Sequence, residues 1–396
     1  MISSVAELPG SEWDALCDGR PYLNHGWLCT VAQCAHTPPD YRFLLFRERE
    51  ELVGAAACVA AEARRSGDSF ETRLFGRAAT AARLSGLSLL PAVICGVGAA
   101  HGSAGLLIAP HLNPHEQANV CHRLIDSLEA FADRERRTLI FNNLLATEPW
   151  RGILEGRGYA RTMVPPSVTM PVPWRDFDGY LAYLKSRSRS AAKNARQEMR
   201  RCRESGIDIR QAAFTPEMTS QAFRLLQSHH RLKNRQRFPF KEGFLEEAHD
   251  HCGERAELRL AAAGEQLAAA SFSLRHGATV WQAFIGMDHE LSGRGFASLN
   301  LMFYAPVEDA VRSGVRELVL GPGSYETKIS RGGQLVERFV FVRRRRRRWQ
   351  APLTRALQLH ERWHLRRYAP LYARARALDE KASVVSHKSC INSRSV

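Results

Sequence analysis

The pattern of apolar and polar positions is clearest between residues 264 and 331, where it predicts a compact α/β unit. In chain order it predicts a strand, a turn, a second strand, an amphipathic helix and a short buried strand, at Gln266–Leu274, His276-Gly277, Thr279–Met287, Phe296–Ser313 and Val315–Leu320. The glycine-containing stretch Ser292–Gly295 is expected to form the loop that opens the helix, and Gly314 to end it.

The first half of the chain repeats this order of elements. It contains a predicted hairpin, a long amphipathic helix and a buried strand, at Tyr41–Arg47 with Glu51–Ala60, at His115–Arg134 and at Thr138–Asn142. Two short helices are expected before the hairpin, one N-capped by Ser11 and one beginning near His25. The Pro-rich stretch Met163–Pro173 then reads as a connection.

We therefore expect two similar α/β domains, each with a mixed, mostly antiparallel sheet flanked by helices, followed by a basic helical tail. The predicted boundaries are 1–165, 166–345 and 346–396. The tail has apolar and aromatic residues at helical spacing between residues 353 and 378, and its last fifteen residues are expected to lack structure.

The positive charge is concentrated in two segments. The net charge is +15, yet residues 343–396 carry 15 Lys and Arg against 3 acids, and residues 185–203 carry 8 against 1, so the remainder is slightly acidic. The basic segment 185–203 predicts either a solvated helix face or a surface for a polyanion, with Lys193, Arg196, Arg200 and Arg201 as the expected contacts. The arginine-rich tail could pack on the body, or contact RNA or an anionic membrane surface.

Composition favours a globular cytoplasmic protein. Hydrophobic residues make up 44% and charged residues 24% of the chain, and no apolar run reaches the length of a membrane helix, so no transmembrane segment is expected. The N-terminus lacks the features of a secretory signal. Nine cysteines without a regular spacing fit a reducing compartment better than a disulfide framework.

Three further sequence patterns were considered, and none of them predicts a functional site. Gly96–Gly102 lacks the third glycine and the following helix of a dinucleotide-binding motif, and is expected to be a loop. The histidines at 229, 230, 249 and 251 with Cys252 do not have a zinc-site spacing, so no metal site is expected. No nucleophile-elbow sequence is present.

Three stretches resemble the GNAT superfamily of acyl-CoA N-acyltransferases, and within it the tandem branch of FemAB-like proteins and polysaccharide-operon (cellulose-biosynthesis type) acetyltransferases. They are the basic helix and strand at Phe177–Ile209, the hairpin at Leu258–Gly286, and GVRELVLGPGSYETKISRGG from Gly314, with its Gly-Pro-Gly turn and following lysine. Together they cover about half of the chain.

The resemblance implies an N-acyltransferase in which an amine attacks a thioester that is held by backbone amides of a splayed strand. It implies that Val280–Met287 is that strand and that the helix start binds the donor's pyrophosphate. The residues expected to bind the donor are Phe284, Ile285, Gly286, Gly293, Arg294, Gly295, Phe296 and Ala297.

The same resemblance assigns the chemistry to the segment after the Gly-Pro-Gly turn. Glu326 is the expected base, Tyr325 the acid and Lys328 an anchor for a carboxylate or phosphate. Trp281, Gln282 and Arg331 are expected to contact the substrate. Only the second domain is expected to be catalytic, because the first lacks both the arginine-containing glycine loop and the Gly-Pro-Gly segment.

Three functions stay open at this stage. The first is transfer from acyl-CoA (acetyl-CoA), as cosubstrate without any tightly bound cofactor, to an amine of a small-molecule, cell-envelope or secondary-metabolite precursor. The second is a Fem-type ligase that uses aminoacyl-tRNA, which the two basic segments favour. The third is a non-catalytic polyanion-binding protein.

Overall fold

The computed structural model describes residues 1–62, 70–75, 79–80, 84, 88–97, 105–344 and 346–392. It divides into two compact units. The first unit comprises Met1–Ala32, Pro38–Ser167 and Val336–Tyr368, and the second comprises Gln33–Thr37, Val168–Leu335 and Ala369–Val396. The sequence analysis assigned residues 336–345 to the second domain, whereas strand β12 (Gln334–Arg343) pairs from Arg338 onward with β5 (Thr138–Leu145) of the first unit.

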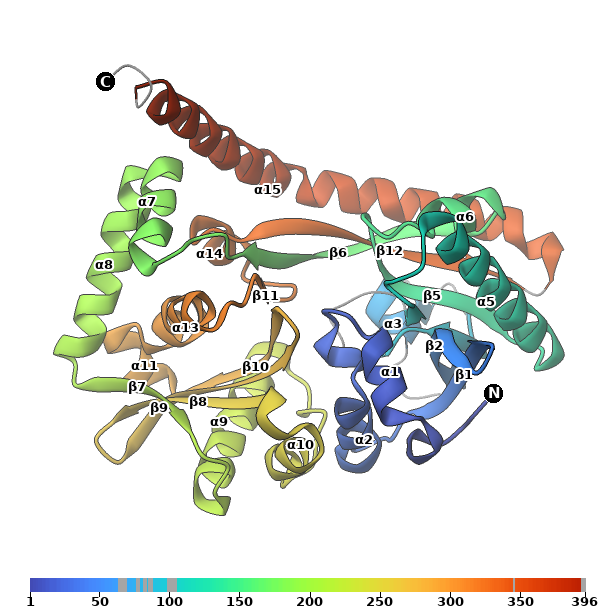
Figure 1. Cartoon of the computed structure of the whole chain (residues 1–396), viewed down its shortest axis with the longest axis horizontal. Coiled ribbons are helices and arrows are strands. Elements are labelled where there is room, and N and C mark those ends of the chain that lie inside the picture. The colour runs from blue at the N-terminus through green and yellow to red at the C-terminus, as the bar shows by residue number, and fades with distance from the viewer. Residues whose placement is uncertain are drawn as a thin grey trace. The chain divides into compact units, whose positions relative to one another are not determined.

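The sheet of the first unit is mixed (Figure 1). Its other strands are β1 (Asp40–Glu48), β2 (Glu51–Ala61), β3 (Ala92–Cys95) and β4 (Leu106–Ile108). β2 pairs antiparallel with β1, β3 and β4, and β3 pairs parallel with β5. The parallel pair is joined by helix α5 (Pro114–Arg134), which begins with a capping box between Asn113 and Glu116. The predicted hairpin, helix and strand are therefore confirmed.

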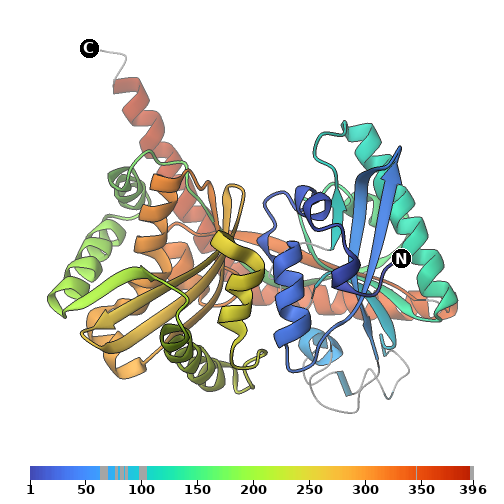
Figure 2. The same cartoon turned by 60° about the horizontal axis from the view of Figure 1, so that its bottom comes forward.

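Helices cover both faces of this sheet. The short helices are α1 (Gly10–Leu16), α2 (His25–Cys34), α3 (Phe70–Phe75) and α6 (Arg151–Gly156), with 3-10 turns at Val5–Glu7, Pro21–Leu23 and Arg347–Trp349. α1 lies on one side of β1 and β2 and α5 on the other (Figure 2). α1 begins at Gly10, with Pro9 at the N-cap position, so Ser11 lies inside the helix and does not cap it.

The second unit has the same order of pairings. Its strands are β7 (Ile207–Ala212), β8 (Ala256–Ala263), β9 (Gln266–His276), β10 (Thr279–Met287), β11 (Glu317–Val319) and the end of β6 (Ala160–Pro171), whose first part, up to Ser167, belongs to the first unit. β7 to β10 are antiparallel neighbours, β10 pairs parallel with β11, and β11 pairs antiparallel with the second half of β6. Both units are mixed, mostly antiparallel sheets flanked by helices, which confirms the predicted fold class.

The helices of the second unit form two layers. They are α7 (Phe177–Arg187), α8 (Arg189–Glu204), α9 (Pro216–Asn234), α10 (Phe244–Cys252), α11 (His289–Gly295), α12 (Ala297–Leu299), a π-helical turn (Asn300–Tyr304), α13 (Ala305–Ser313) and α14 (Tyr325–Ser330), with a 3-10 turn at Gly253–Arg255. α9 and α10 cover one face of the sheet, and α8, α11 and α13 cover the other (Figures 1 and 2). Apolar residues of β10, β11, α7 and α13 form the core on the α13 side.

Two predictions about connections were wrong. The Pro-rich stretch at 163–173 is part of strand β6, because its apolar side chains at 164, 168, 170 and 172 are buried and strand pairing continues through Pro171. The basic segment is also not one continuous helix, because Ser188 has an extended backbone (φ −160°, ψ 128°) that separates α7 from α8.

The tail forms one long helix, α15 (Gln350–Asn392), which contains Pro370. It continues through most of the fifteen terminal residues that were expected to lack structure, and residues 393–396 lie outside the described range. Across the described residues, no helix has the length and apolar character to cross a membrane. Eight cysteines are described, and all are free thiols. Most of the predicted loop Gly96–Gly102 lies outside the described residues.

Candidate functional site

Strand β10 leaves its parallel partner after three residues. The register runs from Thr279 opposite Glu317 to Trp281 opposite Val319, where β11 ends. β10 continues to Met287 while it remains paired with β9, with a bulge between Gln282 and Phe284. Along residues 282–287, which we call the splayed segment, no residue of β11 pairs with β10 in the described range 105–344. The second part of the strand that the family resemblance indicated therefore has no parallel partner on β11 within the described residues.

The two faces of the splayed segment pack on different helical layers. Phe284 belongs to a group of aromatic rings with members on β9, on α10 and in the loop before α10, and its ring centroid lies 5.3 Å from that of Phe238. Ile285 packs on the opposite face, against the cluster of α8, α12 and β7. Trp281 is completely buried, so in this structure it is a core residue and offers no surface to a substrate.

Gly286 lets helix α9 approach the splayed segment closely. A Cβ atom at this position would lie 2.3 Å from the backbone nitrogen of Leu226 and 2.6 Å from the carbonyl oxygen of Leu225. Both distances are far below van der Waals contact, so only glycine fits. The glycine that the resemblance assigned to the donor is thus covered by α9.

Gln282 satisfies a carbonyl of the π-helical turn. Its Nε2 donates to the carbonyl oxygen of Met302 at 2.9 Å. A π turn shifts the helical hydrogen bonds by one residue, and such turns are frequent at functional sites. The side chain predicted to contact substrate therefore ties the first residue of the splayed segment to the helix above it.

Lys328 is buried beneath the Gly-Pro-Gly turn. It is 5% exposed, and its Nζ donates to the carbonyl oxygens of Leu320, Gly321 and Pro322 at 2.7, 3.0 and 3.2 Å. Burial, together with the charge of Lys233, lowers the pKa of Lys328 to about 7. The ammonium group holds in place the backbone that follows β11, at the point where β10 and β11 separate.

Two other helices bring basic side chains to this region. Lys233, near the end of α9, donates from Nζ to Ser324 Oγ at 3.2 Å. One turn earlier on α9, His229 stacks on His289 of α11, with 5.3 Å between the ring centroids. His229 is 6% exposed, and its Nδ1 has no hydrogen-bond partner among the described residues. Burial and the charges of Lys233, His289 and His230 lower its pKa to about 4, so the imidazole is neutral.

The other two predicted catalytic residues lie on α14. Tyr325 is half-buried against the core on the α13 side. Glu326 has a side chain that is 74% exposed and forms an ion pair with Arg374 of α15 at 3.3 Å. Glu326 thus occupies a more open position than Lys328.

The glycine-containing stretch expected to be a loop is helical, which corrects the sequence analysis. α11 begins at His289 because Asp288 caps it, accepting hydrogen bonds from the backbone nitrogens of Glu290 and Leu291. The helix is interrupted only at Phe296, which has a left-handed backbone (φ 53°). The side chain of Arg294 lies outside the described part of the chain.

The surroundings of the two glycines differ. Gly293 has open space where a Cβ would lie, whereas at Gly295 a Cβ would come within 2.5 Å of Ile207 Cδ1. Ala297, which follows the interruption, is completely buried.

The structure brings the predicted donor segment and the predicted polyanion helix together. The guanidinium of Arg201 on α8 lies 5.7 Å from the ring centroid of Phe296. Lys193, Arg196 and Arg200 are exposed on the same helix, and Arg200 forms an ion pair with Glu204 one turn on. Exposed cations therefore flank the helix interruption that ends α11.

A buried acid on α8 anchors this basic helix. Glu198 accepts two hydrogen bonds from Arg331, at 2.7 and 2.8 Å, and one from the hydroxyl of Tyr304. The side chain of Glu198 is 11% exposed, and that of Arg331 is 14% exposed. Burial works against the charge of Arg331, but Tyr304 and Glu198 outweigh it and raise its pKa. Arg331, expected to contact substrate, is bound to protein groups.

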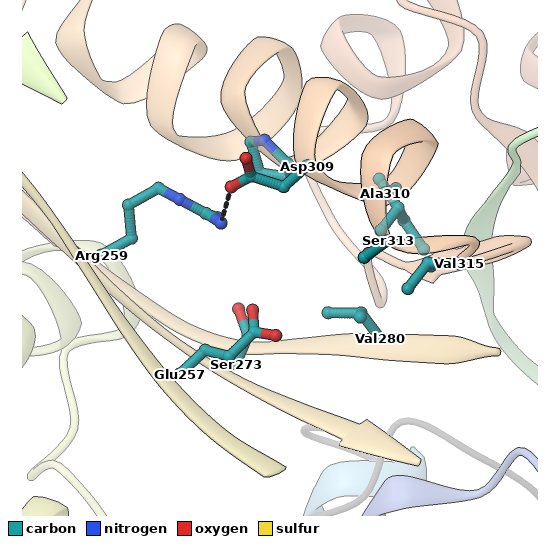
Figure 3. A pocket seen from close by; sticks show the side chains of 10 residues that line it. Glu257, Arg259, Ser273, Val280, Asp309, Ala310, Ser313 and Val315 are labelled. Carbon is teal, nitrogen blue, oxygen red and sulfur yellow. Dashed lines mark hydrogen bonds and ion pairs between the residues drawn. The ribbon is translucent and has the colours of Figure 1, made fainter. Parts of the chain in front are cut away.

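A separate small cavity lies on the α13 side of the sheet, under the paired part of β10 (Figure 3). Arg259 forms a buried ion pair there with Asp309, which also pairs with Arg312. Glu257 faces the same space, and burial raises its pKa, partly offset by Arg259 and Arg275. The cavity contains none of the predicted site residues, and we assign its ion pair to holding α13 on β8.

Metal binding was not expected, and within the described ranges no three His, Cys, Asp or Glu side chains are grouped as ligands. The sequence analysis considered His229 only as a metal ligand and did not single out Lys233, His289 or Glu198. The one signal it could have used for Glu198 is its place on the buried stripe of α8, with Ala192, Ala195 and Cys202.

Comparison with family models identifies one domain, which lies within the second unit. A family model described as an acetyltransferase (GNAT) domain matches residues 189–329. Comparison with curated proteins gives no significant match.

Solved structures show the fold of the whole chain. FemX has a TM-score of 0.56 at 11% identity, over 86% of this chain and 97% of its own. L-PGS from Bacillus licheniformis has a TM-score of 0.51 at 10% identity, over 91% and 99%. The C-terminal domain of a protein from Agrobacterium fabrum assigned as a lysylphosphatidylglycerol synthetase has a TM-score of 0.52 at 10% identity, over 91% and 98%. Residues 189–329 thus match an acetyltransferase (GNAT) domain, and the chain as a whole has the fold of FemX.

Proposed function

We propose that the second unit transfers an acyl group from acyl-CoA to an amine, by direct attack of the amine on the thioester along the splayed segment of β10. The observation that carries this proposal is the register: β10 has nine residues, and only the first three pair with β11. A strand edge without a partner strand offers backbone N–H and C=O groups to a ligand. The acceptor is an amine of a small molecule or of a cell-envelope or secondary-metabolite precursor.

The splayed segment can perform two tasks in this reaction. Its backbone can hold the pantetheine arm parallel to the strand, which fixes the thioester relative to the amine. Its N–H groups can donate to the carbonyl oxygen as negative charge develops on it during attack. No covalent intermediate on the protein is required. Besides the charge on the carbonyl oxygen, the site must accept the proton that the amine loses and stabilise the thiolate that leaves.

Arg201 and the helix interruption at Phe296 are our proposed site for the phosphates of the donor. Arg201 and the neighbouring exposed cations of α8 provide the positive charge that the 3′-phosphate and pyrophosphate need. Asp288 already occupies the start of α11, which disfavours an anion there. The second helix start, at Ala297, is closer to Arg201 in this arrangement.

Proton transfer can be assigned to two alternative sets of groups. Glu326 with Tyr325 is the set that the family resemblance indicated. The stacked pair His229 and His289 is the set that the structure adds. His289 is its exposed member, and the buried His229 beside it is neutral. Lys328 acts as a positioning residue, because its amine donates to three successive carbonyls at the end of β11.

The first unit is proposed to be non-catalytic. Its equivalent parallel pair is fully matched: all four residues of β3 pair with β5, from Ala92 opposite Thr138 to Cys95 opposite Phe141. Within the described residues, which stop at Val97 and resume at Gly105, it therefore offers no splayed segment of the kind found in β10. We place the protein in the cytoplasm, where acyl-CoA is available and free thiols persist.

Release of CoA thiol from acetyl-CoA, measured with a thiol reagent against a panel of amines, tests this function. R201E should raise the KM for acetyl-CoA about tenfold or more while leaving the melting temperature unchanged, and R134E on α5 is the matched control. E326Q and H289N are compared at saturating acetyl-CoA. The variant that lowers kcat identifies the set that contains the base. An absence of thiol release with every amine, and of acetyl-CoA binding by calorimetry, would reject the proposal.

A second candidate is transfer from aminoacyl-tRNA. The observation that favours it is that exposed cations run along the whole of α8, and their number exceeds what one pyrophosphate and one phosphate require. They are Arg189, Lys193, Arg196, Arg200, Arg201 and Arg203. Binding of bulk tRNA at two salt concentrations separates the candidates, because each duplex phosphate contacted contributes a slope of about −0.9. Tight, steeply salt-dependent binding that R196E/R200E/R201E abolishes would favour tRNA as the donor carrier.

A further inference from the structure

The first part of helix α15 presents apolar side chains to solvent. Of the large hydrophobic side chains that are strongly exposed among the described residues, three lie within seven positions of one another: Leu359 at 64%, Trp363 at 52% and Leu365 at 44%. Isolated exposed hydrophobics are normal, but a group of them that includes tryptophan marks a contact surface.

The opposite side of the same helix is firmly packed, so this exposure does not result from a loosely attached helix. Leu353 and Leu357 are buried in the core of the first unit, against strands β5 and β12. His360 Nδ1 and Thr162 Oγ1 share a hydrogen bond at 2.8 Å, and Glu361 forms an ion pair with Arg161 at 2.9 Å. The face with Leu359 and Trp363 is therefore held outward.

Arginines surround the exposed apolar residues. Arg355, Leu359, Arg362 and Arg366 follow one another at intervals of three and four residues, which places them on one side of the helix. All three arginines are exposed, and within the described residues none of them forms an ion pair. Arg367 stacks over the Trp363 ring, 5.2 Å from its centroid. Residues 343–368 contain ten arginines and one acid.

We propose that this face of α15, comprising Arg355, Leu359, Arg362, Trp363 and Arg366, docks on the surface of an anionic lipid bilayer. A helix that lies in the interface needs apolar side chains to enter the headgroup region and cations to meet the lipid phosphates. Tryptophan is the residue that favours that depth. The inference does not depend on the proposed acyl transfer.

The composition of the face disfavours two other occupants. RNA would use the arginines and could stack on Trp363, but it gains nothing from exposed leucines. A second copy of this chain, related by a two-fold axis, would place arginines against arginines. Only a surface that is both anionic and apolar complements all five residues.

Sedimentation of the full-length protein with phosphatidylcholine vesicles, with and without phosphatidylglycerol, tests the proposal. We expect binding that requires phosphatidylglycerol and weakens with salt. R355E/R362E/R366E should reduce partitioning by at least about 100-fold, since each cation near the surface contributes about fivefold and each glutamate adds repulsion from the anionic lipids. L359S/W363S should reduce it by about tenfold. L84S, which alters an 86% exposed leucine elsewhere in the first unit, should have no effect.

The outcomes are separable. Absence of vesicle binding at low salt, equal binding to neutral and anionic vesicles, or full binding by L359S/W363S would each overturn the proposal. Binding of tRNA that is lost in R355E/R362E/R366E, without vesicle binding, would assign the face to RNA. A dimer in light scattering that L359S/W363S converts to a monomer would assign it to self-association. Thiol release measured without vesicles should be unchanged in all these variants.

Discussion

Substitution of Lys328 by methionine should change how the stability of the protein depends on pH. In the folded protein this amine is buried and its pKa is lowered to about 7, whereas in the unfolded chain it has its ordinary value of 10.5. Between these two values the unfolded chain binds more protons than the folded protein. Raising the pH through this window therefore stabilises the folded protein, by about 1.4 kcal/mol per pH unit at most.

The magnitude follows from two opposing effects. Burying the charged amine costs about 5 kcal/mol at and below neutral pH, which is the equivalent of the pKa depression. Its hydrogen bonds to three carbonyls offset part of that cost, since a buried carbonyl left unsatisfied would cost about 1 to 3 kcal/mol; Gly321 keeps a second donor, the backbone nitrogen of Val168. K328M removes both effects and does not titrate. The wild-type advantage over K328M should thus grow by about 2 to 3 kcal/mol from about pH 7 to about pH 9.

Urea unfolding followed by tryptophan fluorescence measures this difference, because every other titrating group is common to the two proteins. K233M provides a second test. The charge of Lys233 contributes to lowering the pKa of Lys328, so removing it should raise that pKa and move the pH-dependent stabilisation to higher pH. A difference between wild type and K328M that is the same at both pH values would refute the reasoning, because the amine would then keep its ordinary pKa. K328M should also release the turn after β11 and reduce acyl transfer at every pH.

Three further predictions concern packing. G286A should destabilise the protein by at least about 2 kcal/mol in chemical unfolding, since its Cβ meets the α9 backbone, whereas G293A on the open side of α11 should be neutral or stabilise by up to about 1 kcal/mol; equal effects would contradict this packing. E198A should cost about 3 kcal/mol because it leaves Arg331 buried and unpaired, and E198A/R331M should cost less than E198A alone; an additive double variant would argue against the pair. D309A should lower the melting temperature because it leaves the buried Arg259 without its ion-pair partner, and it should not change acyl transfer. An unchanged melting temperature would show that this ion pair does not stabilise α13.

Elements with strong local signals could be predicted from the sequence. β10 has the predicted bounds, and α5 begins one residue before the predicted start, because alternation and helical spacing are properties of neighbouring residues. The start of α11 was missed although its signal is local: Asp288 precedes His289 and Glu290 as an N-cap residue does, and the glycines after it drew the interpretation toward a loop.

Features that depend on distant partners could not be predicted. Glu198 lies in a segment whose charge is otherwise basic, and its partners Tyr304 and Arg331 are more than 100 positions away. Lys328 follows a polar turn, which suggested an exposed anchor, and only the three-dimensional arrangement shows that its amine is enclosed by backbone carbonyls. The roles assigned to Glu326, Tyr325 and Arg294 stay predictions.

The splayed segment is held open by contacts that converge on it from several elements, which argues that it is a built feature of the second unit. Lys328 fixes the turn that follows β11, Gln282 ties β10 to the π-helical turn, and Gly286 lets α9 press on the strand from the other face. A strand that merely frayed from its neighbour would need none of these. Each contact uses a residue type that local propensity does not favour at that place: a buried lysine, a glutamine in a strand and a glycine in a strand. Because such choices cost stability, their concentration around six residues of β10 supports our proposal that this edge receives a ligand.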